Sequence, residues 1–205
     1  MTEYATVARA ATAEIEVKRS RFRCRIERVD DEEAARAVVE RARREHWDAR
    51  HHCSAFVLRP GGTVQRSSDD GEPSGTAGAP MLEVLRGREV SDVVAVVTRW
   101  FGGTLLGAGG LVRAYGDAVR AGLDEAGVLT RRLSTRYDVR AGHAVAGRLE
   151  SDLRGRGVHV LGVDHAEQAT LHLAVPAGQD LAALLAELTG GSGTADRVGQ
   201  AWVDG

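Results

Sequence analysis

The chain has 205 residues, a formal net charge of −2 and a hydrophobic content of 43%. This length allows one or two domains, and this apolar content excludes a disordered chain. The near-neutral charge excludes a bulk electrostatic grip on nucleic acid, so any site for a polyanion must be a local patch.

Aromatic residues make up 4% of the chain, which argues against an RNA reader built on stacked aromatic platforms. The first residues include Glu3, Arg9 and Glu14 and lack the apolar core of a signal peptide. The longest apolar run, residues 93–97, is far too short to span a bilayer. We therefore expect a soluble, cytoplasmic protein.

Hydrophobic periodicity predicts the elements of the first part of the chain. Residues 19–26 alternate between polar and apolar, which is typical of a half-buried strand, and the Val-rich run 91–98 predicts a buried central strand. Asp30 or Asp31 is expected to cap the first helix. In chain order we predict strands over 13–17 and 19–26, a helix to about residue 45, a strand over 54–58, a helix from Pro80, a strand over 91–98 and a helix after the second glycine-rich loop.

One face of the predicted 19–26 strand carries a stripe of arginines, which follows Lys18, the only lysine of the chain. The stripe consists of Arg19, Arg21, Arg23 and Arg25. Like charges on one strand face repel unless an anion covers them. Glu14, Glu16 and Glu27 can supply part of that cover, and a polyanionic partner is the alternative.

An acidic loop follows residue 68, with Asp69, Asp70 and Glu72 within four positions. Carboxylate oxygens are the ligands that Mg²⁺ prefers, so these residues are candidates for a metal site. The spacing of a calcium loop is absent, however, and three acids on one turn cannot all point inward. The other interpretation is a turn that caps the following helix and fixes the loop.

A second, glycine-rich loop follows Arg99 and opens a helix, the context in which backbone amides bind phosphates. Its candidate anion-binding residues are Gly102, Gly103, Gly107, Gly109 and Gly110, together with Arg99. The loop has no Gly-Lys-Ser/Thr and lacks the third glycine of the dinucleotide fingerprint. An anion site and close strand–helix packing both remain open.

The residues His51, His52 and Cys53 suggest a base beside a nucleophile. Adjacent strand residues point to opposite faces, so His52 and Cys53 cannot easily form a reactive pair, and a buried thiol is expected instead. Cys24 and Cys53 show neither a disulfide framework nor a zinc-binding spacing.

The last third of the chain predicts a second domain. A short linker is expected over 129–134, and the domains are placed at 1–132 and 133–205. The predicted elements are a strand (134–140), a helix (144–154), two strands (158–164 and 168–175), a helix (180–188) and a strand (194–203). This β-α-β-β-α-β order is that of the ferredoxin-like fold. The fold class is therefore α+β, with two domains.

Four segments carry a family resemblance. Ser-Asp-Asp-Gly-Glu-Pro-x-Gly-Thr-Ala-Gly-x-Pro-Met-Leu (68–82), Arg-Trp-Phe-Gly-Gly-x-Leu-Leu-Gly-x-Gly-Gly-Leu-Val-x-Ala-Tyr (99–115), Lys-x-Ser-x-Phe (18–22) and Asp-Ala-x-His-His-Cys (48–53) resemble the YigZ/IMPACT family. The resemblance covers essentially the whole chain. It implies a first domain similar to the second domain of a small-subunit ribosomal protein, with a mixed sheet and helices on one face, and a ferredoxin-like second domain.

The resemblance also bears on function. Bacterial members of this family are thought to bind nucleic acid or to act near translation, and the family has no agreed catalytic residue. We therefore predict a non-enzymatic, translation-associated protein whose partner is RNA or the ribosome. Its contacts would come from the arginine stripe, Arg99 and the 102–110 loop.

Two alternatives remain open, and the sequence does not decide whether the protein is an enzyme. In the first, Asp69, Asp70 and Glu72 would hold Mg²⁺ and the glycine-rich loop with Arg99 would bind the phosphate of a small phosphorylated or nucleotide substrate. No cofactor is expected otherwise. In the second, the chain is a protein-interaction domain whose loops complete the fold.

Overall fold

The computed structural model describes residues 1–191 and 193–205 and divides into two compact units. The first unit consists of Glu3–Thr130 with Met1, and the second of Arg131–Gly205 with Thr2. Among the described residues, no helix combines the length and apolarity that crossing a membrane requires.

The first unit is built on a five-stranded sheet of order β2–β3–β6–β4–β5, and neighbouring strands are antiparallel. Its elements are β1 (Glu3–Val7), β2 (Ala11–Val17), β3 (Ser20–Arg28), α1 (Glu32–Glu45), β4 (His51–Leu58), β5 (Val64–Ser68), α2 (Gly78–Gly87), β6 (Val93–Trp100) and α3 (Ala108–Ala126). The predicted strands and helices are present, and β1 and β5 are additional.

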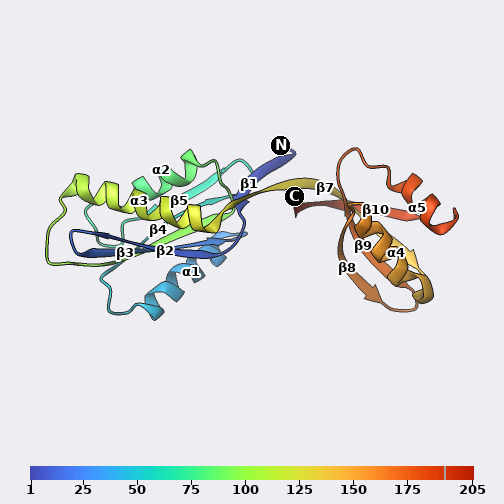
Figure 1. Ribbon diagram of the computed structural model, residues 1–205, viewed down its shortest axis with the longest axis horizontal. Helices are drawn as coiled ribbons and strands as arrows, with labels where there is room; N and C mark the ends of the chain where they lie inside the picture. Colours follow the sequence, from blue (N-terminus) through green and yellow to red (C-terminus); the bar gives the residue numbers. More distant parts are fainter. Residues whose placement is uncertain (192) are drawn as a thin grey trace. The chain divides into compact units, whose positions relative to one another are not determined.

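Helices cover both faces of this sheet (Figure 1). On one face, α2 and α3 pack on alternate residues of β3, β4 and β6, with Tyr115 and Phe22 fully buried between them. On the other face, α1 packs through Val38 on Phe56 and Val96. The predicted α+β class with two domains is confirmed, but the sheet is antiparallel and helices cover both of its faces rather than one. Consecutive residues of β4 and β6 are apolar and point to opposite faces of the sheet, so both faces must be buried by helices.

Helix α1 begins as the sequence predicts. Asp31 is its N-cap, and its side chain accepts a hydrogen bond of 2.7 Å from the backbone N–H of Ala34. The buried residues Ala35, Val38 and Ala42 follow at helical spacing and face the sheet.

The second unit has the predicted β-α-β-β-α-β order, and α4 and α5 contribute to a single core with the sheet. Its sheet order is β10–β7–β9–β8 with antiparallel neighbours, as in ferredoxin-like folds. The elements are β7 (Val128–Ala141), α4 (His143–Gly155), β8 (His159–His165), β9 (Ala169–Val175), α5 (Leu181–Thr189) and β10 (Ala195–Asp204). The predicted linker over 129–134 is wrong, because β7 runs through it and pairs with β10.

On the sheet of the second unit, His172 lies between two carboxylates. Its Nδ1 is 2.7 Å from Asp138 Oδ1 and its Nε2 is 3.0 Å from Asp164 Oδ2. These hydrogen bonds, first that with Asp138 and then that with Asp164, raise the pKa of His172 above its usual value. When protonated, the ring donates to both carboxylates and links β9 to its two neighbours, β7 and β8.

This arrangement predicts a pH-dependent contribution to stability. Because the pKa of His172 is raised on folding, the contribution is complete below its unfolded value of about 6.5 and is lost as the pH rises through the folded value. We expect His172→Gln to lower the unfolding temperature at about pH 6 and to have little effect at about pH 9. Thermal unfolding of both proteins across this range is the measurement, and an NMR titration of the His172 ring gives its pKa. A penalty that grows with pH would contradict the assignment.

Candidate nucleic-acid interface

Four loops of the first unit meet at one end of its sheet, which we call the loop end (residues 18–19, 46–50, 69–77 and 101–107, with the adjoining Arg21 and Arg44). The antiparallel register brings them together: Arg21 pairs with Trp100, and His51 pairs with Arg99. In Figure 1 the β2–β3 turn and the loop before α3 lie together at the left end of this unit. All four segments of the family resemblance reach this end.

Asp69 caps helix α2. Its Oδ1 accepts hydrogen bonds from the N–H groups of Ala77 (3.0 Å) and Gly78 (2.8 Å), and its Oδ2 accepts one from Gly75 (2.8 Å). Burial alone would raise the pKa of Asp69, but these three backbone hydrogen bonds outweigh it and the pKa is lowered. Asp69 is thus a charged cap whose oxygens are engaged by the backbone.

Asp70 holds the acidic loop to the sheet and to α1. One carboxylate oxygen accepts from Arg43 (2.8 Å), the other from the backbone N–H of His52 (2.7 Å), and His51 Nδ1 donates to the Asp70 carbonyl (2.9 Å). The residue adopts a left-handed φ of 40°. These contacts fix the loop.

Glu72 and Arg99 form a buried ion pair. Arg99 Nη1 lies 2.6 Å from Glu72 Oε1, and the side chains are 8% and 3% exposed. Tyr115 donates to the same carboxylate oxygen (2.7 Å), and the rings of Phe22 and Phe101 lie 5.4 and 5.9 Å from the guanidinium. The charge of Arg99 is thus balanced inside the protein.

The three acidic residues of the candidate metal site therefore face three different sets of partners. Asp69 binds backbone amides, Asp70 binds Arg43 and His52, and Glu72 binds Arg99 and Tyr115. Within residues 1–191 and 193–205, no group of three or more His, Cys, Asp or Glu side chains can hold a metal ion. These residues do not fit the Mg²⁺ site that the enzyme alternative requires.

The thiols are also unsuited to nucleophilic catalysis. Burial raises the pKa of Cys53 to about 12 and that of Cys24 further above its usual range. Cys53 Sγ lies 3.0 Å from the Asp69 carbonyl oxygen and 3.3 Å from the Tyr115 hydroxyl, and His52 pairs instead with Thr98. The expectation of a buried thiol agrees with these contacts.

The five glycines of the second loop differ in their surroundings. A Cβ on Gly102 would lie 2.0 Å from the carbonyl carbon of Arg19, so this glycine serves the close packing of two backbones. A Cβ on Gly110 would meet the Leu106 side chain, with Leu106 Cβ nearest at 3.0 Å. Gly103, Gly107 and Gly109 have no such neighbour within 4 Å, and Gly107 precedes α3 as an N-cap without a side-chain bond. Only these three line open space.

The arginine stripe is shorter than predicted. Arg19 lies in the two-residue turn between β2 and β3 with a φ of 67°, and it bonds Thr104 Oγ1 at 3.2 Å. Arg21, Arg23 and Arg25 share the α1 face of β3, as expected. The prediction that Arg19 belongs to the strand face is wrong, because Val17 pairs with Ser20 and leaves Lys18 and Arg19 to form the hairpin turn.

Carboxylates of this chain cover the inner part of the stripe. Arg25 pairs with Glu45 at 2.5 Å, and Arg23 with Glu14 at 2.9 Å. Arg21 is 3.9 Å from Glu14, and its guanidinium lies 4.6 Å from the centroid of the Trp100 ring. The charge of the stripe is therefore least compensated at its Arg21 end, next to the turn.

Sequence reasoning missed three members of the loop end. Arg44, in the last turn of α1, and Arg50, before β4, are exposed and form no ion pair with the described residues. Between them lies Trp47, whose side chain is 83% exposed. None of them lies on an alternating or helical apolar pattern. The only feature of the sequence that could indicate them is the density of Arg and Trp over residues 43–50.

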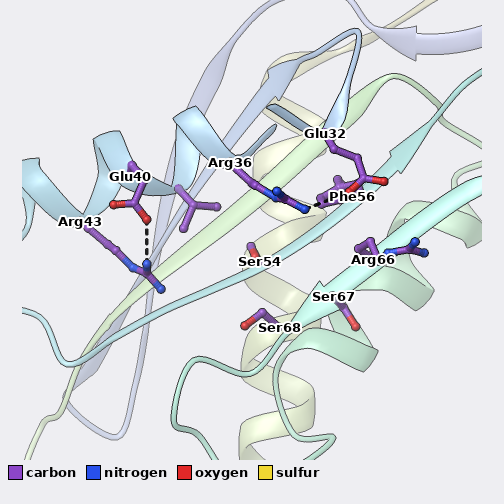
Figure 2. Close-up of a pocket in the computed structure, with 10 residues that line it drawn as sticks. Glu32, Arg36, Glu40, Arg43, Ser54, Phe56, Arg66, Ser67 and Ser68 are labelled. Carbon is purple, nitrogen blue, oxygen red and sulfur yellow. Dashed lines mark hydrogen bonds and ion pairs between the residues drawn. The ribbon is translucent and has the colours of Figure 1, made fainter. Parts of the chain in front are cut away.

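A hollow of about 390 Å³ lies on the same face, between α1 and the strands β4 and β5 (Figure 2). Its basic side chains are largely neutralised: Arg36 is 3.2 Å from Glu32, and Arg43 is 2.8 Å from Glu40. Arg66 is the one arginine of this lining without an ion pair to a described carboxylate, whereas the loop end holds several such arginines and is the better candidate for an anionic partner.

Comparisons with known proteins agree with this organisation. A family model described as Impact N-terminal domain matches residues 18–123, and one described as Domain of unknown function (DUF1949) matches residues 139–192. A solved structure, titled only as a crystal structure of an hypothetical protein, aligns with a TM-score of 0.67 at 37% identity, covering 97% of this chain and 98% of its own.

Two bacterial relatives extend over most of the chain. "IMPACT family member YigZ" of Escherichia coli (strain K12) is 39% identical over 196 residues, which cover 94% of this chain and 96% of the relative. "IMPACT family member YvyE" of Bacillus subtilis (strain 168) is 47% identical over 151 residues, which cover 74% and 70%. The resemblance found in the four sequence segments is confirmed, and the chain belongs to the IMPACT family.

Proposed function

We propose that the protein is a non-enzymatic, translation-associated factor whose first unit binds RNA, free or within a ribonucleoprotein, through the loop end. The observation that carries the proposal is a cluster of basic side chains there, namely Lys18, Arg19, Arg21, Arg44 and Arg50. Apart from Arg21, none of them forms an ion pair with the described carboxylates.

This cluster explains how a chain with a net charge of −2 can still attract RNA. The chain as a whole is slightly acidic, but phosphate contacts depend on local cations, and guanidinium groups match phosphate geometry well. Arg23, Arg25 and Arg99 are each paired with a carboxylate of this chain, so the proposal gives them a supporting role. The space beside Gly103 and Gly107 is also open, so a phosphate can approach the backbone at the same end.

Charge reversal at the loop end provides the test. We expect Arg44→Glu/Arg50→Glu to weaken binding of the full chain to ribosomes and to structured RNA by ten-fold or more at low salt. It should also reduce the dependence of affinity on salt, since each lost phosphate contact lowers the slope of log K against log[salt] by about 0.7–0.9. Co-sedimentation at two salt concentrations, with thermal unfolding to check the fold, is the measurement.

The matched control is Arg9→Glu/Arg86→Glu, which makes the same change in charge at exposed positions toward the opposite end of the same sheet. Equal losses in both double variants would show that only total charge matters, and the proposal would then be wrong. Absence of binding by the unchanged protein at low salt would have the same consequence.

A further inference from the structure

Trp47 is the most exposed aromatic side chain among the large hydrophobic residues that reach the surface of the described chain. Tryptophan is normally well buried, so an 83% exposed ring is an exception that calls for a reason. The other exposed aromatic in this set, Phe101 (52%), belongs to the loop end as well. Both aromatic residues of this exposed set therefore lie at the loop end, close in sequence to basic side chains that form no ion pair with the described carboxylates.

The segment that carries Trp47 is held in place by its two neighbours. The His46 ring lies 5.2 Å from the Trp100 ring, and Asp48 accepts a hydrogen bond of 2.8 Å from Trp100 Nε1. The position of Trp47 is therefore fixed from both sides while its own side chain remains free. Such a ring offers contact area at a low cost in conformational entropy.

Trp100 itself has a different role. One face of its ring is covered by Arg21, whose guanidinium carbon is 4.6 Å from the ring centroid, and its N–H is engaged by Asp48. Trp100 therefore supports residues 46–48 and orients Arg21. Of these two tryptophan rings, Trp47 is the one that can receive a ligand.

We propose that the loop end binds single-stranded RNA, with an unpaired base stacked on Trp47 and the flanking phosphates held by Arg44 and Arg50. This rests on the proposed function and narrows its ligand. Every base has a π face that can stack on an indole, but in a duplex that face is covered by the neighbouring base pairs. Arg44 and Arg50 flank Trp47 in the sequence, as expected for a site where a base stacks on the ring and the phosphates on either side of it meet a cation.

The test compares two RNA probes with the full chain: a fluorescein-labelled oligouridylate ten nucleotides long and a blunt-ended, GC-rich duplex of ten base pairs that has no unpaired bases. We expect Trp47→Ala to weaken oligouridylate binding by about ten-fold or more, the effect of losing one stacked base. Duplex binding should not change. Trp47→Phe, which keeps an aromatic face, should retain most of the affinity.

Leu105→Ala is the matched control, because Leu105 is also 83% exposed at the loop end but offers no π face. It should bind both probes as the unchanged protein does. The salt slope gives an independent readout: loss of stacking lowers affinity with an unchanged slope, whereas disturbance of the cations lowers the slope as well.

The outcomes separate this inference from the proposed function. If Trp47→Ala binds oligouridylate normally while Arg44→Glu/Arg50→Glu does not, the function stands and the stacking proposal is overturned; a protein would then be the better occupant for Trp47. If Trp47→Ala reduces the salt slope, or weakens both probes equally, stacking is overturned too. If the unchanged protein binds neither probe, both proposals fail.

Discussion

Replacing Gly102 with alanine is expected to destabilise the first unit by about 4 kcal/mol or more, a size that single substitutions rarely reach. A Cβ at this position would lie 2.0 Å from the carbonyl carbon of Arg19, 2.2 Å from its oxygen and 2.3 Å from the nitrogen of Ser20. All three atoms belong to the backbone of the β2–β3 hairpin, so no side chain can rotate away. Either the hairpin or the loop before α3 must shift, and both carry the loop end.

Gly109→Ala is the control for this prediction, because the same chemical change there meets no atom within 4 Å. Gly109 lies in the first turn of α3, where alanine is a better helix former by up to about 1 kcal/mol, so a small gain in stability is expected. Urea unfolding of both variants gives the comparison. A Gly102→Ala protein as stable as the parent would mean that the two loops do not meet as described.

The second large effect is expected at the buried ion pair. Arg99→Met removes the cation but keeps an apolar stem, and it leaves the Glu72 carboxylate 3% exposed without its ionic partner. Breaking a buried pair from one side costs about 3–5 kcal/mol, because the remaining charge stays out of water. Tyr115 still donates to the carboxylate, which keeps the expected loss within that range.

Arg88→Met provides a matched comparison. Arg88 and Asp124 are also 2.6 Å apart, but their side chains are 43% and 61% exposed, so the loss should be at most about 1 kcal/mol. Adding Glu72→Gln to Arg99→Met should restore part of the stability, since the unpaired charge disappears. Similar losses at Arg88 and Arg99, or no recovery in the double variant, would show that burial does not set the strength of this pair.

The elements that periodicity predicted well are those with a clear apolar pattern. The alternation of Phe22, Cys24 and Ile26 predicts β3, and the order of elements in the second unit follows from the sequence alone. β5 was missed because Val64–Ser68 is polar and partly exposed, as an edge strand can be. The two arginines and scattered apolar residues of segment 129–134 show no strong pattern and favour a linker, yet residues 131–134 pair with β10.

The candidate site was harder to predict, because its composition depends on pairing between strands far apart in the sequence. The register of β3, β6 and β4 brings the 18–19 turn to the loop before α3 and to Trp47, and no local pattern encodes this. The acidic loop gives an example of a site that the sequence suggests and the structure does not form. The spacing of its three carboxylates in the sequence resembles a metal site. In the structure, however, Asp69 binds the start of α2, Asp70 binds α1 and β4, and Glu72 lies in the core.

The position of Lys18 has a practical consequence. The 27 basic side chains include this one lysine, and it is exposed in the β2–β3 turn at the tip of the loop end. Reagents that acylate amines can therefore modify only two places in this chain, the N-terminal amine and Lys18. A photo-crosslinker or fluorophore introduced by such chemistry would mark the proposed RNA-binding surface of the native sequence without an engineered attachment point, and the N-terminal amine would serve as the internal reference.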